Sequence, residues 1–262
     1  MHPPDSPATA AGLLARSWRE GAHIDDLPAD CRPATRADGY AVQALWQAEQ
    51  EAPVAGWKIA ATSLAGQKHI GVSGPLAGPV FAHRVQPDGA RVSLAANRMG
   101  VAECEVVFGL GSDLPARAQP YTRAEVLAAV RSLHPGIEVP DSRFLAFERA
   151  GEAQLIADCA CCNDMVLGAP VPPDARVDEL PGLQVQAQVS DGRRLQGQGS
   201  NVLGDPVEAL VWLVNELRAA GQALRAGQFV TTGACVVPIA VEPGQRVEAD
   251  FGWIGRIAAQ FE

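Results

Sequence analysis

Three glutamates in two runs of the chain have the residue type and spacing of a cation site. Glu103 and Glu105 lie in AECEVVFGL, and Glu138 lies in HPGIEVPDSR. Residues two apart in an extended strand point to the same side, so the first two carboxylates would meet among apolar neighbours. Burying such a pair is costly without a cation, and Glu138 offers a third oxygen ligand from a similar setting. Oxygen ligands without a neighbouring histidine favour Mg²⁺ or Mn²⁺ over zinc.

The same spacing also fits a plainer interpretation, in which the glutamates lie on the solvent-facing side of an edge strand. The pattern E-x-E is common, and spacing alone does not decide between the two. Lys58, in VAGWKIAATS, is open to two interpretations as well. At the buried start of a strand its pKa would be lowered and it would transfer protons. A surface lysine that lays its stem along apolar neighbours is the commoner case.

Four further residues are candidates for the substrate-binding part of the site. Arg143, in PDSR, either pairs with Asp141 to order its loop or binds a substrate carboxylate through two hydrogen bonds. Asp158, in LIADCACCND, is a helix cap or a support for the site. Thr232 and Gly233, in FVTTGAC, either bind an oxyanion through hydroxyl and amide groups or are simply turn residues.

Covalent hydrolase chemistry finds little support. None of the five histidines has a catalytic context, and the nucleophile motif G-x-S-x-G is missing. The six cysteines include the cluster Cys159, Cys161 and Cys162, which lacks C-x-x-C spacing and therefore gives little support for a zinc site. The residues favour metal-assisted chemistry over a covalent serine or cysteine mechanism.

The composition narrows the class of partner. Of 262 residues, 47% are hydrophobic and 19% charged, and the formal net charge is -9. Without a Lys/Arg cluster, nucleic acid and anionic membranes are poor partners. No apolar stretch approaches the roughly 18 residues that cross a bilayer, and the start MHPPDSPATAAGLLARSW lacks the basic leader of a secretory signal. We expect a cytoplasmic chain with reduced thiols.

The hydrophobic pattern predicts an α+β fold in which strands and helices do not alternate regularly. Helical spacing dominates residues 8–50, and short β-branched runs separated by Gly and Pro follow from Gly56. Further helices are predicted at 122–132, with a capping box, and at 206–219. Asp191-Gly192 predicts a hairpin. We therefore divide the chain into a helical N-terminal segment, 1–55, and a β-rich catalytic core, 56–262.

Eight motifs in order, from about residue 10 to the end, resemble the 2-keto-4-pentenoate hydratase and 4-oxalocrotonate decarboxylase branch of the fumarylacetoacetate hydrolase superfamily. They are GWKIAATS, GVSGPLAGPV, AECEVVFGL, PGIEVPDSR, LIADCACCNDMVLG, GSNVLGDPVEALVWLVNEL, LRAGQFVTTGA and PGQRVEADFGWIGRI. Each motif alone is weak, but eight in the same order across one chain are specific.

The resemblance implies a fumarylacetoacetate hydrolase-like mixed β core behind a helical N-terminal segment. It implies Mg²⁺ or Mn²⁺ held by Glu103, Glu105 and Glu138, with Lys58 as a catalytic acid/base beside the ion. The implied substrates are small 2-oxo or 2-hydroxydienoic acids from aromatic ring breakdown. Members of this branch associate, so we expect a homo-oligomer, with a pathway decarboxylase or hydratase as a further partner.

Two departures from the family pattern leave the reaction open. Hydratases of this branch carry an acidic residue near Pro75, where this chain has Leu76, and this favours a decarboxylase. The segment that usually reads Asp-Asn-Ala-Ser-Ser begins here with Asp158 and continues Cys-Ala-Cys-Cys, and thiols are poorer donors than hydroxyls. We expect a hydratase, with a decarboxylase, an acylpyruvate hydrolase or a non-catalytic partner subunit as alternatives.

Overall fold

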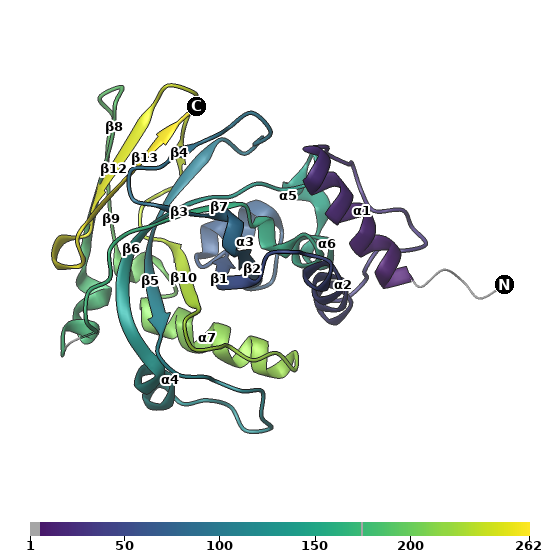
Figure 1. The fold of residues 1–262 in the computed structure, drawn as a ribbon, viewed down its shortest axis with the longest axis horizontal. Coiled ribbons are helices and arrows are strands. Elements are labelled where there is room, and N and C mark those ends of the chain that lie inside the picture. Colours follow the sequence, from purple (N-terminus) through teal and green to yellow (C-terminus); the bar gives the residue numbers. More distant parts are fainter. Residues whose placement is uncertain (1–5, 174) are drawn as a thin grey trace.

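The computed structural model describes residues 6–173 and 175–262 as two β-sheets with helices around them (Figure 1). The helices are α1 (Ser6–Glu20), α2 (Arg36–Ala48), α3 (Leu64–Ile70), α4 (Arg123–Ala129), α5 (Phe147–Ala150), α6 (Glu152–Ala157) and α7 (Pro206–Ala219). The first strands are β1 (Val54–Ala60), β2 (Leu76–Phe81), β3 (Val85–Pro87), β4 (Arg91–Val92), β5 (Val101–Leu110), β6 (Val130–Val139) and β7 (Asp164–Leu167). The later strands are β8 (Gln184–Val189), β9 (Arg194–Gln198), β10 (Phe229–Ala234), β11 (Ile239–Ala240), β12 (Arg246–Asp250) and β13 (Arg256–Phe261).

The larger sheet is mixed and has its longest strands in the middle. Its order is β2-β1-β10-β5-β6-β7-β3, with β11 paired to β5. Strands β1 and β10 run parallel, whereas β5 is antiparallel to both β10 and β6. The smaller sheet has the order β4-β13-β12-β8-β9. This arrangement confirms the predicted α+β fold class.

Helices α1 and α2 lie beside the sheets, on the right in Figure 1, and the smaller sheet lies on the left. Thr35 and Asp38 form a capping box at the start of α2. Trp18 of α1 meets Trp46 of α2 edge-on at a centroid distance of 4.8 Å, and both rings contact Phe81 at the end of β2. These aromatic contacts pack the N-terminal helices onto the β-core. The boundary proposed between residues 55 and 56 stays a prediction.

Two local predictions are confirmed and a third is wrong in its length. Helix α7 spans the predicted residues behind an Asp205 cap, and the Asp191-Gly192 turn joins β8 to β9. The helix predicted at 122–132 has its capping box but ends at Ala129. The chain continues as β6, and Val130 already pairs with Leu110 of β5. Sheet pairing overrides the helical propensity of these last residues.

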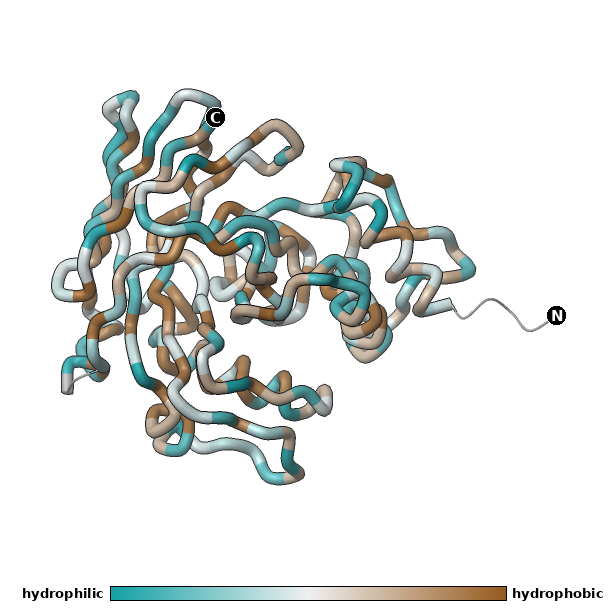
Figure 2. Tube along the Cα trace, in the orientation of Figure 1, coloured by the Kyte–Doolittle hydropathy of each residue, from teal (hydrophilic) through white to brown (hydrophobic). Residues whose placement is uncertain are grey.

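Apolar residues concentrate along the inner strands of the larger sheet, and hydrophilic ones lie mainly in outer loops (Figure 2). Strand β5 is buried along most of its length, because β10 and β6 flank it. Among the described residues, every helix is too short or too polar to traverse a bilayer. The middle of the larger sheet holds Lys58, the three glutamates, Thr232 and Gly233, whereas Arg143 and Asp158 lie outside its strands.

Candidate functional site

The register between β5 and β6 brings the three glutamates together. Glu103 pairs directly with Glu138, and Glu105 lies two residues further along the same face. One carboxylate oxygen from each lies within 4.8 Å of the others. Glu105 is 0% and Glu138 2% exposed, whereas Glu103 is partly exposed. Because β5 is an inner strand, the interpretation as a solvent-facing edge strand is wrong.

Glu105 is held through one of its two oxygens. Its Oε2 accepts hydrogen bonds from the Gly233 amide, at 2.7 Å, and from the Thr231 hydroxyl. Within residues 6–173 and 175–262, its Oε1 has no hydrogen-bond partner. The oxyanion that the Thr-Thr-Gly segment binds is therefore this carboxylate of the protein itself, and one buried oxygen is left for a ligand.

Lys58 lies inside β1, not at its start, and is 2% exposed, so the interpretation as a surface lysine is wrong. Its Nζ lies 3.1 Å from Oε1 of Glu138 and donates a hydrogen bond to the Ala160 carbonyl at 2.9 Å. Sequence reasoning missed Ala160, because a main-chain acceptor has no side-chain signature. The contact with Glu138 is an ion pair, and its second oxygen, Oε2, has no hydrogen-bond partner in the described chain.

In this cluster, several negative charges lie close together and away from water. Burial, followed by the neighbouring carboxylates of Glu138 and Glu103, raises the pKa of Glu105 well above its usual value. Burial raises the pKa of Glu138 to about 7, although Lys58 opposes the shift. Burial lowers the pKa of Lys58, but Glu138 and Glu103 raise it more, so its net shift is upward. Without a bound cation, the neighbouring carboxylates therefore shift this lysine opposite to the lowered pKa that burial alone would give.

The residues present fit a divalent cation. Three carboxylates face one ammonium, so a cation of charge two balances the excess negative charge. The unpartnered buried oxygens of Glu105 and Glu138 are the atoms that such an ion would satisfy. An all-oxygen set of this kind suits Mg²⁺ or Mn²⁺. The six cysteines are free and buried, and the candidate ligand group among the described residues does not include them.

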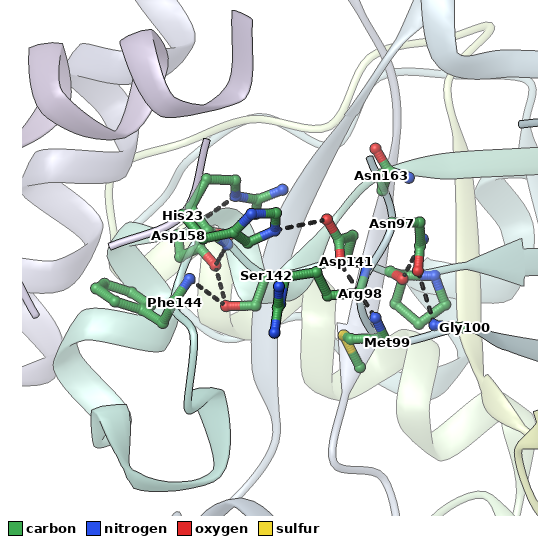
Figure 3. A network of polar contacts seen from close by, with 12 residues as sticks. His23, Asn97, Arg98, Met99, Gly100, Asp141, Ser142, Phe144, Asp158 and Asn163 are labelled. Atoms are coloured by element: carbon green, nitrogen blue, oxygen red, sulfur yellow. Dashed lines mark hydrogen bonds and ion pairs between the residues drawn. The ribbon is translucent and has the colours of Figure 1, made fainter. Parts of the chain in front are cut away.

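Arg143 and Asp158 form a buried pair beside this cluster. The Arg143 guanidinium is bonded to the Asp158 carboxylate. That carboxylate also accepts a hydrogen bond from the Ser142 hydroxyl at 2.7 Å (Figure 3). The ion pair proposed between Arg143 and Asp141 is therefore wrong, because Arg143 pairs with Asp158. The Asp141 carboxylate lies 3.6 Å from Nε2 of His23 instead. Asp158 also ends α6 as its C-cap, as one of the two interpretations proposed.

The groups proposed to bind substrate are engaged within the protein. Thr232 is fully buried and donates its hydroxyl hydrogen to the Val106 carbonyl at 2.9 Å, and the Gly233 amide serves Glu105. Direct contact of these residues, or of Arg143 and Asp158, with a substrate stays a prediction.

A polar cavity of 390 Å³ lies between α1 and the segments that follow β6 and precede β7. Trp18, His23, Asp141 and Asn163 are among its lining residues, and the glutamates are not. Asp164, another lining residue, pairs with Val139, the neighbour of Glu138, so strand alternation turns it to the other face. The three glutamates therefore lie outside this cavity, whereas Arg143 is one of the residues that line it.

Comparisons with known proteins identify the family of this chain. Residues 35–262 match the family described as fumarylacetoacetate (FAA) hydrolase C-terminal. The chain is 32% identical to 2-keto-4-pentenoate hydratase 2 of Dechloromonas aromatica, over 98% of this chain and 97% of that one. It is 30% identical to a 4-oxalocrotonate decarboxylase of a Pseudomonas species, over 80% and 79% of the two chains.

A solved structure, 4-oxalocrotonate decarboxylase from Pseudomonas putida G7 with magnesium and adipate, superposes with a TM-score of 0.86 at 25% identity. The superposition covers 98% of this chain and 97% of that chain. Family match, full-length similarity and superposition all point the same way. The chain belongs to the fumarylacetoacetate hydrolase family, in its 2-keto-4-pentenoate hydratase and 4-oxalocrotonate decarboxylase branch.

Proposed function

We propose that this chain is a metal-dependent hydratase, a carbon–oxygen lyase of aromatic-compound catabolism. Its substrate is a short 2-hydroxydienoate or 2-oxoenoate such as 2-hydroxypenta-2,4-dienoate. The observation that carries this function is the buried set of three carboxylates beside a buried lysine. Hydratase relatives that match nearly the whole chain support the reaction type. We also propose that the chain is cytoplasmic and forms a homo-oligomer. Light scattering on the purified chain would test the oligomeric state.

Glu103, Glu105 and Glu138 hold Mg²⁺ or Mn²⁺ in this proposal. When bound, the ion supplies Lewis acidity to the adjacent carboxylate and 2-oxo oxygens of the substrate. The protein's part is to keep the three carboxylates in place and dry. Thr231 and Gly233 do this for Glu105 by occupying its Oε2.

Lys58 carries the proton in this proposal. Its buried Nζ lies beside Glu138, where its protonated form delivers a proton within the site and its neutral form accepts one. Ketonisation moves a proton from the 2-hydroxyl oxygen to C5 of the dienol. Water then adds across the remaining double bond, with its hydroxyl at C4 and its hydrogen at C3. Both steps need a proton donor and acceptor next to the bound acid.

A 2-oxo acid decarboxylase of the 4-oxalocrotonate type is the second candidate, and Leu76 favours it. This leucine is fully buried at the start of β2 and pairs with Ala60, two residues beyond Lys58. An apolar side chain at this position offers the lysine no carboxylate partner. Loss of CO₂ from a 2-oxo acid leaves the same kind of enolate as the hydratase step, so one site could serve either reaction.

An ultraviolet assay with 2-hydroxypenta-2,4-dienoate, 4-oxalocrotonate and Mn²⁺ tests the proposal. We expect metal-dependent loss of the dienol absorbance with formation of 4-hydroxy-2-oxopentanoate. Turnover of 4-oxalocrotonate alone, with release of CO₂, would assign the decarboxylase. Binding of both acids without turnover of either would make the chain a non-catalytic partner subunit.

A further inference from the structure

The turn that follows α6 has an uncommon backbone. Cys159, Ala160 and Cys161 all have positive φ, at 52°, 51° and 61°. A residue with a side chain pays in free energy for this left-handed conformation. Three such residues in succession persist only where the surrounding contacts hold them, and turns of this kind concentrate at functional sites.

Arg143 holds this turn at both ends. Its Nη2 donates to the Asp158 carbonyl before the turn, and its Nη1 donates to the Cys162 carbonyl after it, at 2.9 Å. Its Nε is bonded to the Asp158 carboxylate. Asp158 is fixed in turn by the Ser142 hydroxyl, as Figure 3 shows. One planar guanidinium therefore sets the separation between the two ends of the turn.

The middle of the turn faces the lysine. The Ala160 carbonyl accepts a hydrogen bond from Nζ of Lys58 at 2.9 Å. The turn lies tightly against β2 at Gly78, which pairs with Lys58, and a Cβ at Gly78 would lie 1.9 Å from the Cys159 carbonyl oxygen. Where the Ala160 oxygen lies therefore depends on the conformation of the turn.

The guanidinium has little capacity left for a substrate. Arg143 is 3% exposed, and its three nitrogens all donate within the protein. The rings of Trp18 and Trp46 lie 4.7 Å and 5.3 Å from its guanidinium carbon, so helices α1 and α2 pack over one part of it, and another part lines the 390 Å³ cavity. Arg143 therefore connects parts of the protein beside the site.

We propose that Arg143 is a positioning residue for Lys58 and acts through the left-handed turn Cys159–Cys161. An ammonium has three N–H donors. The Ala160 carbonyl takes one of them and the Glu138 carboxylate faces a second, so one donor is left for a bound substrate. The kinetic consequence rests on the function proposed above, but the positioning itself does not.

The variant Arg143→Lys tests this assignment, because a lysine keeps the charge but cannot reach both ends of the turn. We expect kcat to fall about tenfold or more, a part of what a general acid–base group contributes. KM and Mn²⁺ affinity, the latter measured by calorimetry, should stay within about twofold, because the three glutamates are untouched. Arg84→Lys is the matched control. Arg84 also lies over the Trp18 ring, at 5.1 Å, but its ion pair is with Asp164 and not with the turn.

Lysine-selective ¹³C NMR reads the position of Lys58 without any turnover. The sequence contains two lysines, Lys58 and Lys68, and Lys68 is exposed. Because Arg143→Lys adds a third lysine, the spectrum is recorded on Arg143→Met, which should shift the ¹³Cε signal of Lys58 and leave that of Lys68 unchanged. If the wild type turns over no dienoate and this shift is still seen, the proposed function fails while the positioning role stands.

A second substitution separates positioning from substrate binding. Glycine adopts positive φ freely, so Ala160→Gly in the Arg143→Lys background should restore part of the lost kcat. An unchanged Lys58 signal together with a tenfold weaker affinity for oxalate, a 2-oxo acid analogue, would overturn the proposal and make Arg143 a substrate ligand.

If Arg143→Lys does not fold, Asp158→Asn removes charge from the other side of the same pair. It should move the same Lys58 signal, and an unmoved signal would again refute the role.

Discussion

Glu105 differs from the other two glutamates because the protein already occupies one of its oxygens. The Thr231 hydroxyl and the Gly233 amide hold Oε2, which leaves Oε1 as its available ligand atom. Charge-assisted hydrogen bonds of this kind fix a carboxylate before any ligand arrives. Loss of such an outer partner commonly weakens metal affinity by about 10–100-fold.

The variant Glu105→Gln should lose metal binding and turnover together. The amide keeps the shape of the side chain but removes its negative charge and offers a single acceptor oxygen. Because loss of an outer partner already costs 10–100-fold, we expect loss of a ligand charge to weaken Mn²⁺ binding by about 100-fold or more. Titration of Mn²⁺ by electron paramagnetic resonance measures it. The exposed Glu248, paired with Arg246, supplies the control Glu248→Gln. Full activity without retained metal in Glu105→Gln would contradict the proposed metal site.

The variant Lys58→Met should separate binding from proton transfer. Methionine fills the buried volume without the ammonium, so the carboxylates lose their counter-charge and Mn²⁺ should bind at least as tightly as in the wild type. Turnover should fall by about 10²–10⁴-fold, the usual contribution of a general acid–base group. Parallel calorimetry and steady-state kinetics distinguish the two effects, with Lys68→Met as the control. Unaltered kcat in Lys58→Met would assign the proton to another group.

At the residue scale, the sequence identified the candidate site residues but not the groups that contact them. The E-x-E spacing correctly placed Glu103 and Glu105 on one face, because strand alternation is a local property. It did not reveal that Ala160 accepts from Lys58, or that Arg143 pairs with Asp158. Those contacts depend on where a distant turn folds back onto the sheet, which no local pattern encodes.

At the scale of elements, strand register positions the site. The pairing of β5 with β6 sets Glu103 opposite Glu138, and a slip of one residue would move Glu138 to the other face. The bounds of α7 were predictable from the Asp205 cap and the apolar stripe. The end of α4 was not, because pairing of Val130 with Leu110 across the sheet ends that helix early.

His134 gives β6 a measurable pH dependence. Its Nδ1 lies 2.9 Å from the Gly168 carbonyl and its Nε2 lies 2.9 Å from the Ser132 hydroxyl. Burial lowers the pKa of His134, and the Gly168 carbonyl opposes this only in part. Below the unfolded-state pKa of about 6.5 the unfolded chain takes up a proton before the folded one does, so this histidine lowers stability as pH falls.

The variant His134→Gln should therefore flatten the pH dependence of stability. Melting temperatures of the two proteins are measured from pH 7.5 to pH 5. The difference between them should be smaller at pH 5 than at pH 7.5. The carboxylate cluster titrates in both proteins and cancels in the comparison. The exposed His69 supplies the control His69→Gln, which should melt in parallel with the wild type. A His134→Gln curve parallel to the wild type would contradict the assigned direction.

At the scale of the whole molecule, the carboxylate cluster lies where the strands of the larger sheet come together. Glu103 and Glu105 belong to β5 and Glu138 to β6, while Gly233 of β10 and Lys58 of β1 contact the cluster. Four strands thus meet around like charges that repel one another in a buried place. A cation bound there would link the strands and relieve the repulsion, so its binding energy would add to the stability of the fold.

Removal of divalent metal should therefore lower the melting temperature of the whole chain. A ligand at 100 times its dissociation constant stabilises the folded state by about 2.7 kcal/mol. For a chain of this size each kcal/mol shifts the melting temperature by about 2–4 °C, so we expect a rise of about 5–10 °C when Mn²⁺ is added to chelated protein. Differential scanning calorimetry measures it. Glu105→Gln is the control, and its melting temperature should rise by about 1–2 °C at most, because it lacks a ligand charge. Equal melting temperatures with and without Mn²⁺ in the wild type would mean that the folded chain does not bind the ion. The glutamates would then be a buried like-charge cluster relieved by protonation alone.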